Sequence, residues 1–154
     1  MAADPTIEAA RGFVDESLTS MRAAVAGAPA DALNRRPAGD DTNAVAVLVV
    51  HAVNSTRRWL SVARGLPLPE RDRPSEFLTT VADADELLAL FDPVAADCRA
   101  LLDTDATFDP GAIREDPRDG DQVTAAWALI HAVEHLREHV AHAELTRQVF
   151  ERPV

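Results

Sequence analysis

Five histidines are the residues of this 154-residue chain whose type and spacing could do chemistry. One stands alone near the end of the first third, and four follow at intervals of four, four and three residues near the C-terminus: His51, His131, His135, His139 and His142. On a helix, residues i and i+4 stand one above the other with Cβ atoms about 5–6 Å apart. That spacing lets two imidazole nitrogens bind one metal ion at about 2.0–2.1 Å.

The sequence offers two overlapping pairs for such a site, His131 with His135 and His135 with His139. A third ligand has to come from another helix, and His51 is the only histidine elsewhere in the chain. Three imidazoles leave at least one coordination position for water or substrate, as catalytic sites do. Spacing favours His135 and His139 as ligands. His51 can equally be read as a hydrogen-bonded core histidine, and His131 and His142 as packed neighbours of the site.

At about 100° per residue, the four C-terminal histidines fall on one narrow stripe of a helix. Large apolar residues flank the stripe on both sides: Trp127, Leu129, Leu136, Val140 and Leu145. We therefore expect the histidines in the middle of the buried arc. Buried imidazoles need partners, because unpaired polar groups are costly in a core.

Two helices are predicted in the first half of the chain. Asp4 followed by Pro5 is a typical helix start, and apolar residues recur at helical spacing from there to Gly27. A second helix is expected from a cap at Thr42 to about Arg64, before a Gly- and Pro-containing stretch.

Two further helices are predicted in the second half. Asp83 and Glu86 form a capping-box-like start for a helix near 84–102, with a kink or break at Pro93. The acidic segment between residues 97 and 121 is expected to be a solvated loop, with an acidic partner surface as the alternative. The last helix is expected to run from Val123-Thr124 to about Phe150. No alternation typical of a strand is present. The predicted fold class is all-α, a four-helix bundle that occupies residues 1–154 as one domain.

The overall charge narrows the classes of partner. The chain carries 15 basic and 26 acidic residues, a net charge of −11, and every basic residue is an arginine. This balance argues against nucleic acid or an anionic membrane as the main partner. The most apolar stretch, 44–53, is too short to span a bilayer, and no signal peptide is evident, so a cytoplasmic location is expected. Cys98 is the only cysteine and is expected to be a buried thiol.

Three runs of residues resemble the DinB-like family, which includes thiol-dependent transferases that use mycothiol or bacillithiol. The run 43–51 followed by Trp59-Leu60 resembles the family's second helix, and Leu33-Asn-Arg-Arg-Pro37 resembles the linker before it. The run 127–142, with its HxxxH spacing, resembles the last conserved helix. The resemblance extends over about residues 13–150. The sequence does not contain the large C-terminal extension of the mycothiol-dependent maleylpyruvate isomerases, which makes that reaction a less favoured expectation.

The resemblance implies an up-down-down-up four-helix bundle that often forms a homodimer. It also implies a divalent metal ion, zinc or nickel, held by His51, His135 and His139. His142 falls where many members have Gln or His just after the ligand, so we treat it as a residue of the pocket.

Such a site could activate a low-molecular-weight thiol, such as mycothiol, for transfer to a small-molecule electrophile, or activate water for hydrolysis. Asn54, Ser55 and Arg58 lie within about 60° of His51 on a helix and could face the same cavity, Arg58 binding an anionic group. Glu134 and Glu138 could orient an imidazole through its second nitrogen. Two alternatives stay open: a non-catalytic metal- or ligand-binding bundle of a stress response, and a structural dimer module whose histidines pack.

Overall fold

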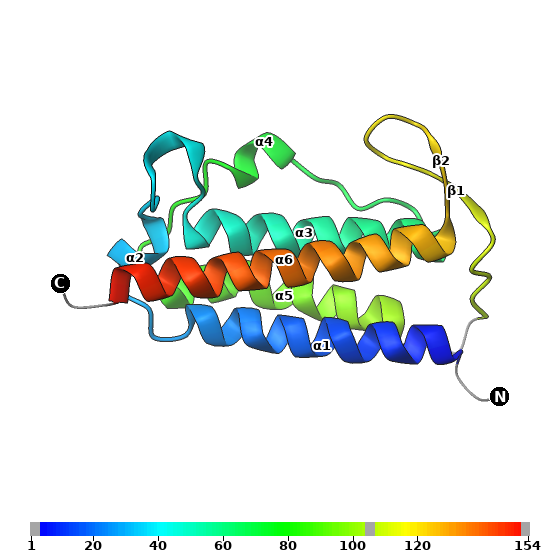
Figure 1. The fold of residues 1–154 in the computed structure, drawn as a ribbon, viewed down its shortest axis with the longest axis horizontal. Helices are drawn as coiled ribbons and strands as arrows, with labels where there is room; N and C mark the ends of the chain where they lie inside the picture. Colours follow the sequence, from blue (N-terminus) through cyan, green and yellow to red (C-terminus); the bar gives the residue numbers. More distant parts are fainter. Residues whose placement is uncertain (1–3, 104–106, 152–154) are drawn as a thin grey trace.

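Four long helices form the body of the protein in a computed structural model that describes residues 4–103 and 107–151 (Figure 1). They are α1 (Pro5–Val25), α3 (Val45–Arg64), α5 (Ala84–Leu102) and α6 (Ala125–Glu151). The shorter elements are α2 (Ala30–Asn34), the 3-10 turn η1 (Gly39–Asp41), α4 (Arg73–Glu76), β1 (Ile113–Glu115) and β2 (Gln122–Thr124).

The bundle has the predicted up-down-down-up topology. Helices α1 and α6 run in one direction, and α3 and α5 run in the other (Figure 1). Helix α3 packs against α5 and α6, and α1 packs against the same two helices from the opposite side. Because α3 and α5 are parallel, the connection 65–83 has to return along the bundle, and it carries α4 across α3. The all-α prediction is therefore confirmed.

Local signals place three of the helix ends. The Asp4 carboxylate accepts hydrogen bonds from the backbone N–H groups of Thr6, at 2.8 Å, and Ile7, at 3.3 Å. Asp83 accepts from the N–H of Glu86 at 2.9 Å. Gly65 ends α3 in the left-handed conformation, with φ +64°, which a side chain would strain.

The start of α3 differs from the prediction. Ala44 occupies the N-cap position and contributes no side-chain hydrogen bond. The Thr42 hydroxyl instead accepts from the N–H of Ala38 at 3.0 Å and donates to the carbonyl of Gly39, also at 3.0 Å. The predicted Thr42 cap is wrong because that hydroxyl closes the preceding turn η1.

Helix α5 continues through Pro93, so of the two predicted alternatives, a kink or a break, the break is wrong. A proline removes the hydrogen bond to the carbonyl four residues earlier, which here belongs to Ala89. Both residues are exposed, so water can solvate that carbonyl at little cost.

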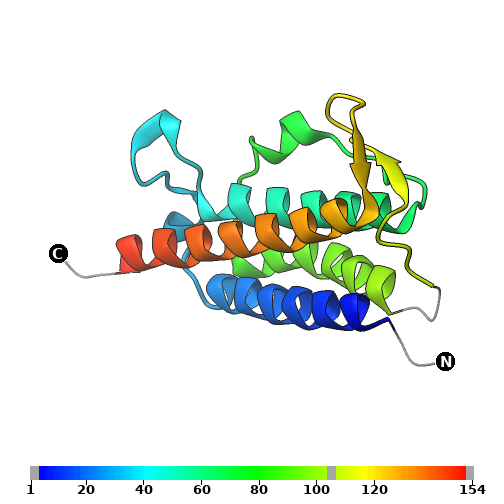
Figure 2. The same cartoon turned by 45° about the vertical axis from the view of Figure 1, so that its right-hand side comes forward.

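A small hairpin was not expected from the sequence. Strands β1 and β2 are antiparallel, with Ile113 opposite Thr124 and Glu115 opposite Gln122. The buried Asp116 closes the turn, because its N–H donates to the carbonyl of Asp121 at 2.7 Å. Strands of three residues are too short to show an alternation, which is why the sequence did not reveal them. The hairpin and α4 rise from the same side of the bundle (Figure 2).

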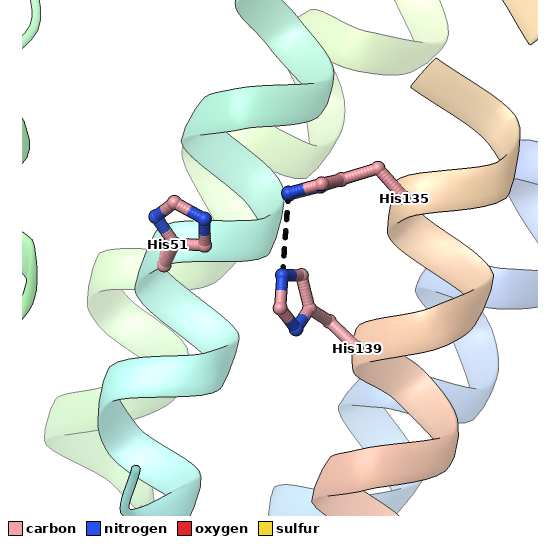
Figure 3. Close-up of side chains that lie close together, drawn as sticks. All are labelled: His51, His135 and His139. Carbon is pink, nitrogen blue, oxygen red and sulfur yellow. Dashed lines mark hydrogen bonds between the residues drawn. The ribbon is translucent and has the colours of Figure 1, made fainter. Parts of the chain in front are cut away.

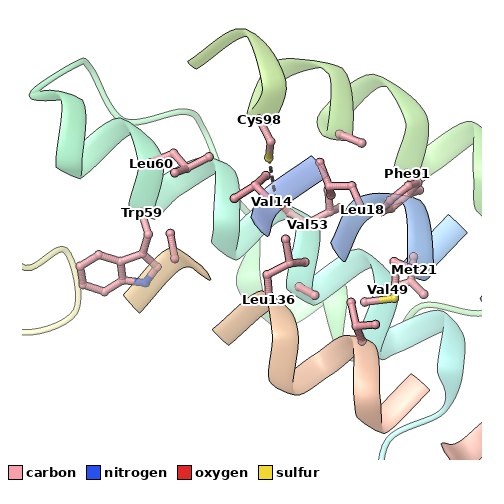
Figure 4. Close-up of a cluster of buried hydrophobic side chains, with 14 of the residues drawn as sticks. Val14, Leu18, Met21, Val49, Val53, Trp59, Leu60, Phe91, Cys98 and Leu136 are labelled. Carbon is pink, nitrogen blue, oxygen red and sulfur yellow. Dashed lines mark hydrogen bonds between the residues drawn. The ribbon is translucent and has the colours of Figure 1, made fainter. Parts of the chain in front are cut away.

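The core lies between the four long helices and is built from fully buried aliphatic and aromatic side chains (Figure 4). Leu18 of α1, Val53 of α3, Phe91 of α5 and Leu136 of α6 are each at most 1% exposed. Cys98 is also fully buried, as predicted, and its thiol lies 3.7 Å from the carbonyl of Val53. Among the described residues, no helix is both long enough and apolar enough to cross a membrane.

Candidate metal centre

Helices α3 and α6 bring three histidines together at their interface (Figure 3). His51, His135 and His139 each present one ring nitrogen, and these three atoms lie within 4.8 Å of one another. The Nε2 atoms of His135 and His139 are 3.2 Å apart. The ring of His51 is centred 5.3 Å from that of His135 and 5.2 Å from that of His139.

The row of histidines lies at the rim of the buried arc of α6, not in its middle as predicted. His135 and His139 are partly exposed and His142 is exposed. Trp127 and Leu145, two of the apolar residues that flank the histidine stripe in the sequence, are 42% and 61% exposed. The buried residues of α6 centre on the direction of Ala132, Leu136, Val140 and Ala143, about a quarter turn away from the histidines. This position suits a ligand-binding site, because one side of each imidazole packs against the protein and the other side can be reached by a ligand.

The second ring nitrogen of His51 is held by a carboxylate that the sequence did not reveal. His51 Nδ1 lies 3.0 Å from Oε2 of Glu76, which belongs to α4 and is 5% exposed. Glu76 also accepts from Arg71 Nε at 2.6 Å and Arg71 Nη2 at 2.8 Å. Burial opposes ionisation of the Glu76 carboxyl, but the hydrogen bonds from Arg71 and His51 outweigh it, and its pKa lies below the ordinary value.

An ionised Glu76 sets the tautomer of His51. A carboxylate oxygen 3.0 Å from Nδ1 requires a donor there, so Nδ1 carries the hydrogen, although Arg71 Nη2 also lies within 3.3 Å. The lone pair of His51 is then on Nε2, which is the nitrogen free to bind a metal. Metal-ligating histidines usually have their second nitrogen fixed by a carboxylate or carbonyl in this way.

The imidazoles of His135 and His139 are neutral at physiological pH. Burial, followed by the neighbouring histidines, lowers the pKa of His135 to about 3. Burial and then the neighbouring His51 lower the pKa of His139 to about 4. Their Nδ1 atoms are buried and have no hydrogen-bond partner among residues 4–103 and 107–151. Neutral imidazole is the form that metals bind, so no proton has to be displaced first.

The donor set fits a divalent metal ion. Two imidazole nitrogens bound at about 2.0–2.1 Å to a tetrahedral ion stand about 3.4 Å apart. The 3.2 Å between the Nε2 atoms of His135 and His139 is close to that separation. Three imidazoles suit zinc, nickel or copper better than magnesium or calcium, which prefer oxygen ligands.

A cavity of about 610 Å³ adjoins the triad. Residues from α3, the connection 65–83, the hairpin turn and α6 line it: His51, Ser55, Arg58, Trp59, Arg71, Arg73, Pro117, Arg118, His131 and His135. Its volume is within the range of small-molecule sites. Ser55 and Arg58 both line this cavity together with His51.

Asn54 and His142 lie elsewhere. The Asn54 amide donates to the carbonyl of Val50 at 2.9 Å and accepts from Arg57, which pairs with Asp97 of α5. It is therefore turned toward α5 and does not line the cavity. The ring of His142 is centred 5.9 Å from that of His139, and the side chain is exposed outside the cavity.

His131 lines the cavity and belongs to an aromatic cluster with Trp59 and Trp127. Its ring stacks on Trp127, with centroids 4.9 Å apart, and meets Trp59 edge-on at 4.7 Å. Its Nδ1 lies 3.4 Å from Glu134, so this acid contacts a histidine outside the triad. Glu138 is exposed, and its charge acts on His139 in the direction that raises the pKa.

An all-α bundle with a three-histidine cluster between its second and last long helices defines the class of this protein. The sequence model of the DinB superfamily matches residues 14–143, and the chain belongs to that superfamily. The chain is similar in fold to a solved structure described as the conserved protein of a locus from Enterococcus faecalis. The two are 17% identical over 96% of this chain and 98% of that one, with a TM-score of 0.73. No curated protein matches the chain.

Proposed function

We propose that His51, His135 and His139 bind one divalent metal ion, zinc or nickel, and that the protein is a metal-dependent enzyme. Its nucleophile is a low-molecular-weight thiol, such as mycothiol, or water, and its second substrate is a small electrophile held in the cavity. The observation that carries this proposal is the convergence of three imidazole nitrogens within 4.8 Å beside a cavity of about 610 Å³. The proposed thiol chemistry follows from the resemblance to the thiol-dependent transferases of the family.

A bound divalent ion with three imidazole ligands and an open coordination position lowers the pKa of a thiol or water toward neutrality. The protein's own residues supply the rest. Glu76 fixes the tautomer of His51, and Arg71 holds Glu76 through two hydrogen bonds. Trp59 is among the residues that line the cavity, and it is almost fully buried.

Metal content is the direct test. The full chain should be purified without a histidine tag, reconstituted with zinc or nickel, and assayed for bound metal by mass spectrometry. We expect about one equivalent per chain, retained by His142→Ala and lost by His51→Ala and His139→Ala. His142→Ala is the matched control, because it removes an exposed histidine of the same helix that lies outside the triad.

Two results would contradict the metal site. One is a protein that takes up no metal after reconstitution. The other is His51→Ala and His139→Ala binding as much metal as the parent while melting at the same temperature. Either would leave a structural bundle whose histidines only pack.

Turnover separates an enzyme from a metal-binding protein without catalysis. The zinc- and nickel-loaded forms should be assayed with mycothiol and a chromogenic electrophile such as 1-chloro-2,4-dinitrobenzene, and with a nitrophenyl ester for hydrolysis. A rate that depends on the metal and is lost in His139→Ala supports the enzyme. A metal-loaded protein that accelerates neither reaction over the rate of the buffer supports the non-catalytic alternative.

A further inference from the structure

The lining of the cavity beside the triad has an unusual charge for this protein. The chain carries a net charge of −11. The lining nevertheless contains four arginines, from α3, the connection 65–83 and the hairpin turn, and no carboxylate: Arg58, Arg71, Arg73 and Arg118. A cleft lined by one sign of charge raises the local concentration of ligands of the opposite sign.

Two of these four arginines are already paired. Arg71 donates twice to Glu76, and its side chain is 9% exposed. Arg118 donates to both oxygens of the buried Asp116, at 3.0 Å from Nε and 2.6 Å from Nη2. These pairs fix His51 and the hairpin turn, respectively. Their carboxylates have already neutralised both guanidinium groups.

The other two arginines, Arg58 and Arg73, have no carboxylate within ion-pair distance in the part of the chain that the structure describes. Most arginines of the described residues do have one, as expected of a chain with 26 acidic residues. The cavity thus contains two guanidinium groups whose hydrogen-bond donors are not used by protein carboxylates. Ligand oxyanions are the natural acceptors for such groups.

The position of Arg73 links this unpaired charge to the triad. Its guanidinium lies over the ring of Phe77, 5.0 Å from the centroid. The Phe77 ring in turn packs against His51, with centroids 4.8 Å apart. Arg58 follows His51 on α3 by about two helical turns and lines the same cavity. The two arginines therefore flank the space next to the three imidazoles.

We propose that Arg58 and Arg73 bind the oxyanion of a small-molecule substrate, a carboxylate or a phosphate, in the cavity beside the triad. The paired arginines, Arg71 and Arg118, position other groups and do not bind this anion. The aromatic cluster of Trp59 and His131 packs against the uncharged part of the same molecule. The proposal deepens the proposed function by naming the substrate class and rests on it for the identity of the cavity as a substrate site.

Calorimetric titration with three simple probes tests this assignment. Benzoate carries a carboxylate, phenyl phosphate carries a phosphate, and benzamide is the neutral isostere of benzoate. Each is titrated into full-length protein at low ionic strength, in a chelator-treated form and a zinc-loaded form. The chelator-treated form excludes direct binding of the anion to a metal, so the result does not depend on the proposed metal site.

We expect benzoate or phenyl phosphate to bind both forms and benzamide to bind neither. Arg58→Gln and Arg73→Gln should each weaken anion binding by about tenfold or more, the effect of losing a charge-assisted hydrogen bond. Arg58→Lys should recover part of the loss, because it restores the charge without the planar fork. Arg64→Gln is the matched control, since Arg64 lies on the same helix, lines a separate cavity and also lacks a carboxylate partner among the described residues.

The preferred probe identifies the oxyanion as carboxylate or phosphate. The proposal is overturned if no anion binds, if benzamide binds as tightly as benzoate, or if Arg58→Gln and Arg73→Gln bind like the parent. Binding that occurs only in the zinc-loaded form also overturns it, because the anion is then on the metal. A failure of the metal site alone shows differently, as a chain without bound metal that still binds the anion through its arginines.

Discussion

Replacing Glu76 should affect both the stability of the protein and its affinity for metal, for two separable reasons. Glu76 is 5% exposed and accepts hydrogen bonds from Arg71 and from His51 Nδ1. Glu76→Ala leaves the 9%-exposed Arg71 side chain without its carboxylate, and breaking a buried ion pair costs about 3–5 kcal/mol. It also removes the group that fixes the tautomer of His51, a loss that lowers metal affinity by about 10–100-fold.

The double variant Arg71→Met/Glu76→Leu separates the two effects. An apolar pair of similar volume removes the unpaired charge, so we expect the free energy of unfolding to recover, short of the parent by about 1–3 kcal/mol for the buried His51 Nδ1–H that is left without an acceptor. Zinc affinity should stay about 10–100-fold lower, because His51 Nδ1 still has no carboxylate. Urea denaturation measures the stability of the metal-free protein, and competition with a chromophoric chelator measures the affinity. Glu70→Ala, an exposed acid of the same connection, is the control and should change neither.

The reasoning is refuted by a double variant that binds zinc as tightly as the parent, since Glu76 would then not orient His51. It is also refuted if Glu76→Ala unfolds at the same urea concentration as the parent, which would mean that the Arg71–Glu76 pair is effectively solvated.

Four further predictions concern Cys98, Gly65, the two histidines of α6 in the triad, and the oligomeric state. Burial raises the pKa of Cys98 to about 12, so the native protein should not react with a disulfide reagent at pH 8, whereas the protein in urea should react fully. Gly65→Ala should destabilise the protein by about 1–2 kcal/mol in urea denaturation, because φ is +64° and the new methyl would lie 3.0 Å from the Arg114 guanidinium. In chelator-treated protein the folded-state pKa values of His135, about 3, and His139, about 4, lie below the unfolded value of about 6.5. Their contribution to stability is therefore complete above pH 6.5. On acidification toward pH 4 the free energy of unfolding should fall by up to about 1.4 kcal/mol per pH unit for each histidine. Urea denaturation at pH 7 and pH 5 tests this, and equal free energies of unfolding at both would contradict it. The homodimer implied by the family resemblance should be visible as twice the chain mass in light scattering after gel filtration, and a mass of 16.6 kDa would contradict it.

The parts of the fold that sequence could predict are those that local interactions decide. Asp4 and Asp83 cap helices because their carboxylates reach backbone N–H groups two or three residues later. The break at Pro93 was wrongly predicted because the free energy that a proline costs inside a helix depends on whether water reaches the carbonyl left without a donor. That in turn depends on which face of α5 is buried. The position of the histidines on α6 was wrongly predicted for a similar reason. Trp127 and Leu145 are apolar but exposed, so the apolar arc of the sequence is wider than the arc that is buried.

The candidate site also contains residues that local spacing predicts and residues that only the tertiary fold brings together. His135 and His139 could be paired from their spacing, because four residues on one helix fix their separation. Glu76 could not be assigned to His51, which is 25 residues away, because α4 lies in a connection whose course no periodicity encodes.

The arginines of the cavity show most clearly which part of the site the sequence alone could not predict. Arg58 lies on α3, Arg71 and Arg73 on the connection 65–83, and Arg118 in the hairpin turn, so only the tertiary fold collects them. The net charge of −11 averages over the whole molecule and hides a local concentration of arginine. The long helices supply the imidazoles and Arg58, and the connections supply the other three arginines of the lining. Because the connection 65–83 supplies both Glu76 and Arg73, exchanging it should weaken metal binding and anion binding together, whereas Arg73→Gln should weaken only anion binding.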